Sequence, residues 1–479
     1  MNLLLIASEC APFVKTGGLA DVIGAIPKAL SQEGVQGRVL LPLYPALQDV
    51  AEKGSVVAEL GELFGGNARL LAVSAEGLDL LLLDAPHLYD RPGSIYLGRD
   101  GQDWHDNHIR FAALSMIGAR IGIEGVDGWT PDVVHAHDWQ AGLVPVYMRQ
   151  MSGNPPPCVM TIHNIAFQGV FGAEVMGDLG LDPRGFTTDG FEYYGRISFL
   201  KAGLAHCHKI TTVSPTYARE LMLPEFGMGL EGLLQARKGD LLGILNGIDT
   251  DVWNPETDNA IEQTYSARTL KRKATNREAL ERRFDLQSNP DAPLFCVISR
   301  LTDQKGLDLL IEVLPQLIER GARLALLGSG SPDYEHAFKQ AAHNHHGRVG
   351  VVIGYDETLS HQMQAGSDAI LIPSRFEPCG LTQLYGLRYG TLPVVARTGG
   401  LADTIIDAND AALQAKAATG VQFAPVTAES LAQSIDRTCD LFLDQKVWTS
   451  MVRNAMKHPV GWDQSARQYL SVFKGLIAS

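Results

Sequence analysis

The chain has 479 residues, of which 45% are hydrophobic and 20% are charged, as expected for a globular protein of two or three domains. Its 40 lysines and arginines are outnumbered by 54 aspartates and glutamates, and the formal net charge of −14 argues against a general nucleic-acid-binding protein. An anionic small ligand is still allowed, because a local group of cations can override the average field.

The cysteines and the N-terminus indicate the compartment. Six cysteines are scattered without a C-x-x-C pair or a regular spacing, which favours a reducing environment over a disulfide framework. The first apolar run is short, lacks a basic segment before it and is followed by Glu9, so it predicts a buried strand rather than a signal peptide. No stretch approaches the roughly 20 apolar residues that span a bilayer. We expect a cytoplasmic protein without a membrane partner.

Short apolar runs alternate with helix-length amphipathic segments along most of the chain, the pattern of parallel strands buried on both faces. The expected strands are, in chain order, Leu3–Ala7, Val39–Leu41, Leu80–Leu83, Asp132–His135, Val159–Ile162, Ile210–Val213, Leu294–Ser299, Leu324–Leu327, Val349–Ile353, Ala369–Pro373 and Pro393–Ala396. The clearest helices are Leu19–Glu33, Trp104–Ile121, Leu307–Arg320 with a kink at Pro315, and a closing helix from Trp462 to Ile477. This alternation predicts an α/β fold.

The regular alternation breaks once, in the turn-rich stretch Asn246–Asp258, which we interpret as a crossing between domains. It divides the chain into halves of similar size. A Rossmann-like sheet in each half is favoured over a single TIM barrel, because the segments 64–92 and 223–239 do not fit eight evenly spaced units.

One heptapeptide is almost repeated: Lys15-Thr-Gly-Gly-Leu-Ala-Asp21 recurs as Arg397-Thr-Gly-Gly-Leu-Ala-Asp403. Each copy lies between an expected strand and an expected helix. A cation followed by backbone N–H groups at a helix start suits an anion. A single copy could equally be a tight turn that binds no ligand. Two copies, one in each half, predict two sheets that face each other across a cleft, each with an anion-binding turn.

Two strand ends in the second half carry further candidates. Arg300 and Lys305 follow one strand, at the sheet edge where α/β proteins bind ligands, and two cations there suit a diphosphate. Glu377 follows another strand, and Gly380–Thr382 begin the next helix with unbonded N–H groups. A carboxylate beside an anion site suits sugar hydroxyls or a developing oxocarbenium charge. Alternatively, Glu377 caps the helix or pairs with Arg375.

In the first half, His135 and His137 share one face of a strand, and His163 follows the next strand. His-x-His admits a metal-dependent hydrolase as an alternative, although no further ligands with metal-like spacing are evident. At the crossing, Asp249-Thr-Asp251 resembles a metal-holding Asp-x-Asp pair, but Asx turns explain it more simply.

Together these strings resemble bacterial glycogen synthases, the ADP-glucose-using retaining glucosyltransferases related to plant starch synthases. The resemblance extends nearly end to end and rests on the following motifs: Lys15–Asp21, Asp84–Arg91, His135–Trp139, Asn246–Asp249, Arg300 with Gln304-Lys305-Gly306, and Ser374–Thr382. It implies a GT-B fold: a Rossmann-like domain at 1–245, a nucleotide-sugar-binding domain at 246–458, a catalytic cleft between them, and a helix at 459–479 crossing back.

The resemblance also implies roles for individual residues. It implies catalytic roles for Glu377, Arg300, Lys305, His163 and Asp138, and ADP-glucose contacts for Lys15, Gly17, Gly18, Tyr96, Asn246, Tyr355, Cys379, Gly380, Leu381 and Thr382. Within this set, Arg300 and Lys305 neutralise the diphosphate, and His163 meets the glucose 6-hydroxyl. No metal or other cofactor is implied.

The implied reaction moves glucose from ADP-glucose to an α-1,4-glucan, a neutral polymer that suits an acidic surface. Retention without an obvious second carboxylate near Glu377 favours front-face substitution, with domain closure about 246–258. Alternatives are the hydrolase above, a non-catalytic glucan-binding protein, and a phosphorylase, which fits neither the length nor any pyridoxal-type lysine.

Overall fold

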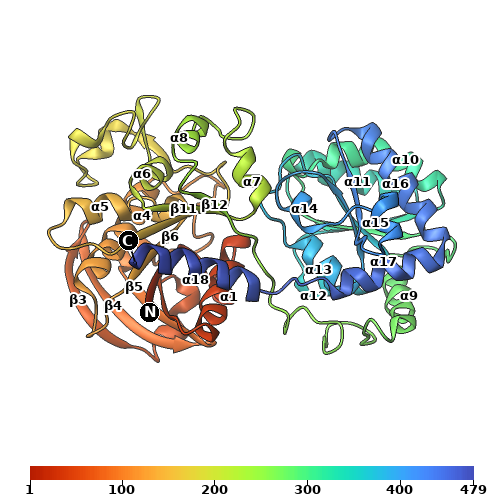
Figure 1. The fold of residues 1–479 in the computed structure, drawn as a ribbon, viewed down its shortest axis with the longest axis horizontal. Helices are drawn as coiled ribbons and strands as arrows, with labels where there is room; N and C mark the ends of the chain where they lie inside the picture. Colours follow the sequence, from red (N-terminus) through yellow and green to blue (C-terminus); the bar gives the residue numbers. More distant parts are fainter. Residues whose placement is uncertain (479) are drawn as a thin grey trace. The chain divides into compact units, whose positions relative to one another are not determined.

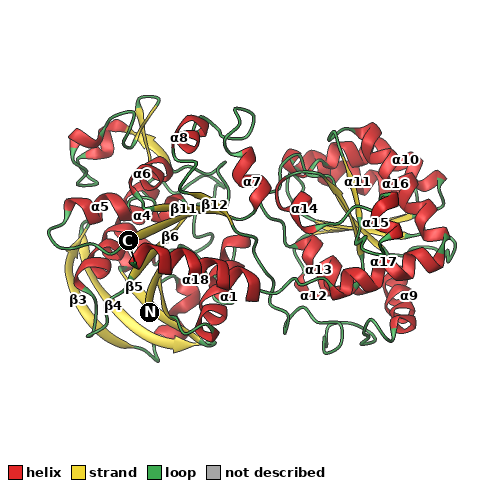
Figure 2. Cartoon of the chain, in the orientation of Figure 1, coloured by secondary structure: helices red, strands yellow, loops and turns green. Residues whose placement is uncertain are grey.

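The computed structural model describes residues 1–478, which divide into two compact units. The first unit runs from Met1 to Asn246 and also includes the C-terminal segment that begins at Trp462; the second runs from Gly247 to Gly461. Each consists of helices packed around a largely parallel sheet (Figures 1 and 2). The segment 244–269, which contains the expected crossing, has neither helix nor strand.

The first unit is built on a nine-stranded sheet with the order β12-β11-β7-β6-β1-β2-β5-β4-β3. Its strands are β1 (Asn2–Ile6), β2 (Gln36–Pro42), β3 (Ser55–Leu63), β4 (Gly66–Ala75), β5 (Leu78–Asp84), β6 (Val133–His137), β7 (Cys158–Ile162), β11 (Lys209–Thr212) and β12 (Leu241–Gly243). From β12 to β5 every pairing is parallel. The six strands expected in this half of the chain are present as β1, β2, β5, β6, β7 and β11.

The far edge of this sheet differs from the expectation. β3 and β4 form an antiparallel hairpin that continues into β5, and the sequence pattern did not reveal either strand. The β3–β4 turn is Phe64-Gly65, and both residues have positive φ (48° and 91°), as a two-residue hairpin turn of type I′ requires. A separate three-stranded sheet is formed by β8 (Val170–Gly172), β10 (Arg196–Ser198) and β9 (Glu192–Tyr193).

The helices of the first unit include the C-terminal one. They are α1 (Gly18–Gln32), α2 (Gln48–Ala51), α3 (Pro86–Tyr89), α4 (Asn107–Glu124), α5 (Val144–Gln150), α6 (Phe199–His206), α7 (Pro215–Glu220), α8 (Glu231–Ala236) and α18 (Asp463–Ile477). The expected helices at 19–33, 104–121 and 462–477 are confirmed, with α4 shifted by three residues. α18 lies beside α1 (Figure 1) and buries Ala466, Tyr469 and Phe473. Tyr469 and Phe473 lie against the ring of His135 on β6, at centroid distances of 5.5 Å.

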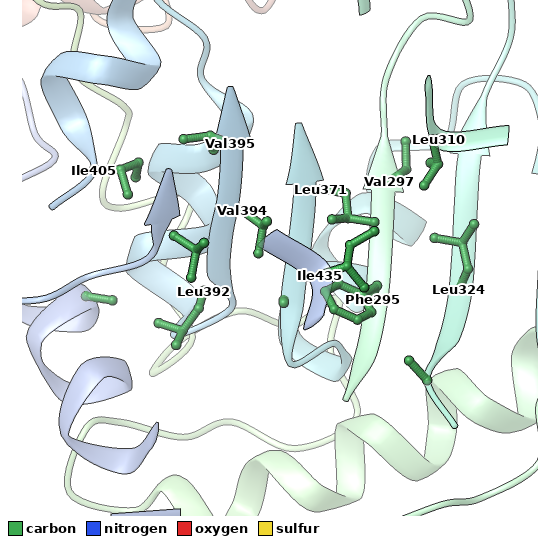
Figure 3. Packing of buried hydrophobic residues seen from close by; sticks show 14 of the residues in the cluster. Phe295, Val297, Leu310, Leu324, Leu371, Leu392, Val394, Val395, Ile405 and Ile435 are labelled. Carbon is green, nitrogen blue, oxygen red and sulfur yellow. The ribbon is translucent and has the colours of Figure 1, made fainter. Parts of the chain in front are cut away.

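The second unit has a fully parallel six-stranded sheet with the order β15-β14-β13-β16-β17-β18. Its strands are β13 (Leu294–Ile298), β14 (Arg323–Gly328), β15 (Val349–Ile353), β16 (Ala369–Ile372), β17 (Leu392–Ala396) and β18 (Val421–Phe423). The five expected strands are confirmed. In Figure 3, Phe295, Leu324 and Leu371 from neighbouring strands pack with Leu310 and Ile435 from the helices in one buried cluster.

The helices of the second unit surround this sheet. They are α9 (Lys273–Arg283), α10 (Leu307–Glu319), α11 (Pro332–Asn344), α12 (Glu357–Gly366), α13 (Thr382–Tyr389), α14 (Gly399–Thr404), α15 (Asp410–Gln414), α16 (Ala428–Leu443) and α17 (Gln445–Lys457). The helix expected at 307–320 is present as α10 and continues through Pro315. Within residues 1–478, no helix combines the length and the apolar character needed to cross a membrane.

Because Phe473 is fully buried against β6, we predict that Phe473→Ala lowers the free energy of unfolding of the first unit by about 3–5 kcal/mol. Urea unfolding measures this. The control is Lys474→Ala on the exposed neighbouring position, which should change the value by less than about 0.5 kcal/mol. Equal effects of the two substitutions would show that α18 is not packed as described.

Candidate active site

The functional candidates of the first unit follow three neighbouring parallel strands. β7, β6 and β1 are adjacent in the sheet, and their carboxyl ends lead into His163, Asp138 and Ser8-Glu9. In parallel strands the carboxyl ends share one edge, so these side chains belong to one edge of one sheet.

Asp138 has an unusual backbone conformation. Its φ of +55° and ψ of −172° fall in a region that is almost restricted to glycine, at a cost of about 1–3 kcal/mol. The conformation is held from both sides, because Asp138 N–H donates to the Thr161 carbonyl (2.9 Å) and Asp138 Oδ1 accepts from the His163 N–H (2.7 Å). Asp138 therefore couples the end of β6 to the end of β7.

Burial controls the protonation of this edge. Burial raises the pKa of Asp138 to about 7, against the opposing effect of the His163 and Asn164 backbone N–H groups and with a smaller upward contribution from the Glu9 charge. Burial lowers the pKa of His163 to about 3. At neutral pH the imidazole of His163 is uncharged, as suits hydrogen bonding to a sugar hydroxyl.

His135 and His137 share one strand face, as predicted, with ring centroids 4.0 Å apart. His135 Nε2 lies 2.6 Å from Thr161 Oγ1, and His137 Nδ1 lies 3.0 Å from His163 Nε2. Burial lowers the pKa of His135 to about 3. Among residues 1–478, no three His, Cys, Asp or Glu side chains are grouped as a metal site requires. The hydrolase hypothesis therefore lacks a ligand set in this part of the chain.

Glu9 occupies the turn that leads into α1. Its side chain is buried, and its Oε2 accepts from the backbone N–H groups of Thr16 (2.6 Å) and Gly17 (3.2 Å). The hydroxyl of Tyr96 donates to Oε1 (2.8 Å) and lies 2.7 Å from Ser8 Oγ. Burial raises the pKa of Tyr96 well above its ordinary value.

These contacts correct the expectation for the first Thr-Gly-Gly turn. Two of its backbone N–H groups are bonded to Glu9 and are not available to an external anion, while Gly18 opens α1 one residue later. Lys15 is exposed and forms an ion pair with Asp21 (2.8 Å). The turn therefore offers Lys15 and the helix start at Gly18, rather than the whole peptide.

In the second unit, Lys305 and Glu377 come together. Lys305 Nζ lies 2.6 Å from Glu377 Oε2, which also accepts from the Ser374 hydroxyl (2.9 Å). Arg375 bonds instead to both carboxylate oxygens of Asp308 (2.7 and 2.6 Å), so the pairing of Glu377 with Arg375 is excluded in this structure. Arg300 is exposed and its guanidinium contacts no acceptor among residues 1–478.

The loop after β16 leads directly into α13. Cys379 is buried, Gly380 has a φ of +72°, and a Cβ at Gly380 would come within 2.4 Å of the Gln383 amide oxygen. Leu381 is the N-cap and Thr382 the first residue of α13, so their N–H groups precede the intrahelical hydrogen bonds, as expected. Tyr355, two residues after β15, is 74% exposed.

The second Thr-Gly-Gly copy is not a free anion turn either. Gly400 N–H donates to the carbonyls of Glu377 (3.0 Å) and Pro378 (3.2 Å). A Cβ at Gly399, whose φ is +43°, would lie 1.9 Å from the Glu377 carbonyl oxygen. The glycines are therefore required because α14 packs against the loop that carries Glu377, which corrects the anion-binding interpretation of this copy.

Two candidates at the crossing have plain structural surroundings. Asn246 ends the first unit and is buried, and its amide oxygen finds no hydrogen-bond donor in the described chain. Asp249 Oδ1 accepts from the N–H groups of Asp251 (2.9 Å) and Val252 (3.1 Å). Asp249-Thr-Asp251 is thus an Asx turn, as predicted.

Comparison with known proteins decides the family. Residues 2–236 match the starch synthase catalytic domain family, and residues 279–457 match the glycosyl transferases group 1 family. A glycogen synthase of Roseobacter denitrificans is 66% identical over 477 residues and one of Rhizobium tropici is 54% identical over 478, with 99–100% of each chain covered. The catalytic domain of starch synthase IV from Arabidopsis thaliana, bound to ADP and acarbose, is 31% identical with a TM-score of 0.89, covering 100% of this chain and 99% of that one.

The chain belongs to the glycogen and starch synthase family. It is a glycosyltransferase of glycogen or starch synthesis with a GT-B fold, in which each of the two units contains a largely parallel sheet. The family inferred from the sequence motifs is therefore confirmed, as are the fold and the class of enzyme.

The sequence did not predict three features of the site in this chain: the hydrogen bonding of Glu9, the hydrogen bond of Ser374 to Glu377, and the contact between Gly399 and the loop that carries Glu377. The sequence does carry a signal for Glu9, because Ser8-Glu9 directly follows the first apolar run, and polar residues at strand ends lie at the edge where α/β sheets bind ligands. No comparable signal existed for Gly399, since its reason lies in a neighbouring loop.

Asp138 generates a prediction about pH. The folded protein retains the Asp138 proton up to about pH 7, whereas the unfolded chain loses it near pH 4, so this group makes stability fall as the pH rises between those values. We predict that Asp138→Asn removes this dependence and therefore stabilises the protein more at pH 8 than at pH 5.

Urea unfolding at the two pH values measures this difference. Asp49→Asn, an exposed position in the same unit, is the matched control and should show the same effect at both pH values. A stability difference between Asp138→Asn and wild type that does not change with pH would contradict the assignment.

Proposed function

We propose that the chain transfers glucose from ADP-glucose to the non-reducing end of an α-1,4-glucan with retention of configuration, releasing ADP. The observation that carries the proposal is the pair of Lys305 with Glu377 (2.6 Å) near the helix start at Gly380–Thr382. A cation, a carboxylate and free helix N–H groups are the parts that a sugar diphosphate needs. The ADP and acarbose bound to the starch synthase IV catalytic domain support the same pair of substrate classes.

In this proposal the two cations of the second unit act on the leaving group. Arg300, exposed and without a partner in the described chain, and Lys305 neutralise the diphosphate as the C1–O bond to phosphate breaks. Gly380, Leu381 and Thr382 contribute N–H donors, Cys379 lines the loop, and Tyr355 lies near the adenine. No metal or other cofactor takes part.

Glu377 has a second task in the proposal. Because Lys305 and Ser374 both bond to its Oε2, the carboxylate is held in one orientation before substrate arrives. It then stabilises the oxocarbenium-like glucose, while the acceptor 4-hydroxyl attacks C1 on the same face and gives its proton to the departing phosphate oxygen. One C–O bond forms and one breaks on the same face of C1, and for that reason the α configuration is retained.

The first unit contributes the sugar-side groups. Neutral His163 hydrogen-bonds the glucose 6-hydroxyl, and Asp138, whose carboxylate is fixed by the His163 N–H, lies beside it. Lys15 and Gly18 provide contacts to the donor from the turn before α1, with Asn246 as a further contact, while the Gly17 N–H is already bonded to Glu9. Tyr96 acts through the hydrogen bond of its hydroxyl to Glu9.

The first test is release of ADP from ADP-glucose with and without glycogen. We expect ADP release that depends on glycogen, that is much faster than UDP release from UDP-glucose, and that persists in the presence of a chelator. Binding of glycogen without ADP release would indicate a glucan-binding protein instead, and loss of all activity on chelation would overturn the metal-free proposal.

The second test is the role of Lys305. We predict that Lys305→Ala lowers kcat with ADP-glucose by about 10²–10³-fold, because one charge-stabilising group is removed from the leaving diphosphate. Lys271→Ala, an exposed lysine of the same unit, is the control and should leave kcat unchanged. Turnover of Lys305→Ala near that of wild type would contradict the assignment.

A further inference from the structure

The most completely bonded carboxylate outside the described reaction is that of Glu9. It is 3% exposed, and it lies three residues after the end of β1, at the carboxyl edge of the sheet. Thr16 donates to it from two groups: the backbone N–H to Oε2 (2.6 Å), and the single hydroxyl hydrogen shared between Oε1 (2.9 Å) and Oε2 (3.0 Å). Gly17 N–H and Tyr96 Oη complete the set, so both carboxylate oxygens are in use.

These bonds define the start of α1. The N-cap residue of α1 is Gly17, which has no side chain to accept a hydrogen bond, and the helix has no side-chain cap of its own. Glu9, which lies after β1 and outside the helix, acts as the cap instead, because its carboxylate accepts hydrogen bonds from the N–H groups of Thr16 and Gly17. It also places a negative charge near the positive end of the helix dipole. The position of Gly18 thus depends on Glu9.

The turn itself is otherwise exposed. Lys15, Thr16, Gly17 and Gly18 all lie at the surface, and Lys15 is held only by its ion pair with Asp21 in the described chain. An exposed glycine-containing turn samples many conformations unless it is tied to a rigid element. Glu9 ties it to the end of a buried central strand, and Tyr96 and Ser8 fix the carboxylate in turn.

We propose that Glu9 is a positioning residue for donor binding: its carboxylate holds the Thr16–Gly17 backbone so that Lys15 and the Gly18 N–H are presented to the nucleotide sugar. The inference rests on the proposed function, since it assigns the donor to this turn. It also gives Tyr96 a different task from the ADP-glucose contact that the sequence resemblance implies, because the Tyr96 hydroxyl orients Glu9. Glu9 touches neither substrate nor reacting atoms.

The proposal separates donor binding from acceptor binding. Loss of a hydrogen bond to a charged group costs about 1.5–3 kcal/mol, which corresponds to about a tenfold or greater loss of affinity. Glu9→Ala should therefore raise KM for ADP-glucose at least tenfold and leave KM for glycogen unchanged. Glu9→Gln keeps the shape but offers one acceptor oxygen in place of two, so its donor KM should lie between those of wild type and Glu9→Ala.

Thr16 supplies a second pair of variants at an exposed position that should not perturb folding. Thr16→Val removes the hydroxyl that bonds to Glu9. It should raise the KM for ADP-glucose about threefold or more, which corresponds to the loss of one hydrogen bond at the weak end of the usual range. Thr16→Ser retains the hydroxyl and should behave as wild type. Glu52→Gln, an exposed glutamate of the same unit, is the charge control and should change neither KM.

The experiment measures ADP release at varied ADP-glucose with saturating glycogen, and then at varied glycogen with saturating ADP-glucose. The thermal unfolding midpoint of each variant is measured alongside. A donor KM within twofold of wild type in both Glu9→Ala and Thr16→Val, with unchanged midpoints, would overturn the inference. So would equal rises in both KM values with lowered midpoints, because that result indicates a purely structural role. Absence of ADP release by wild type would instead refute the proposed function, and the inference with it.

Discussion

Parallel pairing of strands is the constraint on which the rest of the molecule depends. In the first sheet, β1 pairs with β6 and β6 with β7, and in the second β13 pairs with β16 and β16 with β17, all in parallel. Parallel strands end at a common edge, so polar residues that are far apart in the sequence become neighbours there. This brings Glu9, Asp138 and His163 to the carboxyl edge of the first sheet. At the carboxyl edge of the second sheet, it brings Lys305 to within 2.6 Å of Glu377.

The polar groups at these edges fix one another before substrate arrives. Glu9 holds the turn before α1, Asp138 accepts the His163 N–H, and Glu377 accepts from both Lys305 and Ser374. Charged groups held in this way need little reorganisation during reaction, which is the main source of electrostatic catalysis. The strained φ of Asp138 fits the same principle, since the bonds on either side of it maintain a conformation that the residue alone would avoid.

Much of the fold follows from the sequence, because buried parallel strands are continuous apolar runs. All eleven expected strands are present. The short strands β8, β9, β10, β12 and β18, of two or three residues each, were not expected, and neither were β3 and β4. The last two form an edge hairpin with half-exposed faces, and Phe64-Gly65 is not among the commonest type I′ turn pairs. The site was recognised through long motifs, but its internal bonding was not. Which donors meet Glu9, and why Gly399 and Gly400 lack side chains, depend on contacts between segments distant in sequence, and no local pattern encodes them.

We propose that Lys15 and Arg300 each bind the phosphates of the donor nucleotide. Calorimetric titration of ADP into wild type, Lys15→Ala and Arg300→Ala tests it most directly, with Lys53→Ala, an exposed lysine of the first unit, as the control. The account predicts that each of the first two variants binds ADP about tenfold or more weakly, because each loses a charge-assisted contact to phosphate, while the control binds as wild type does. Wild-type ADP affinity in either Lys15→Ala or Arg300→Ala would contradict it.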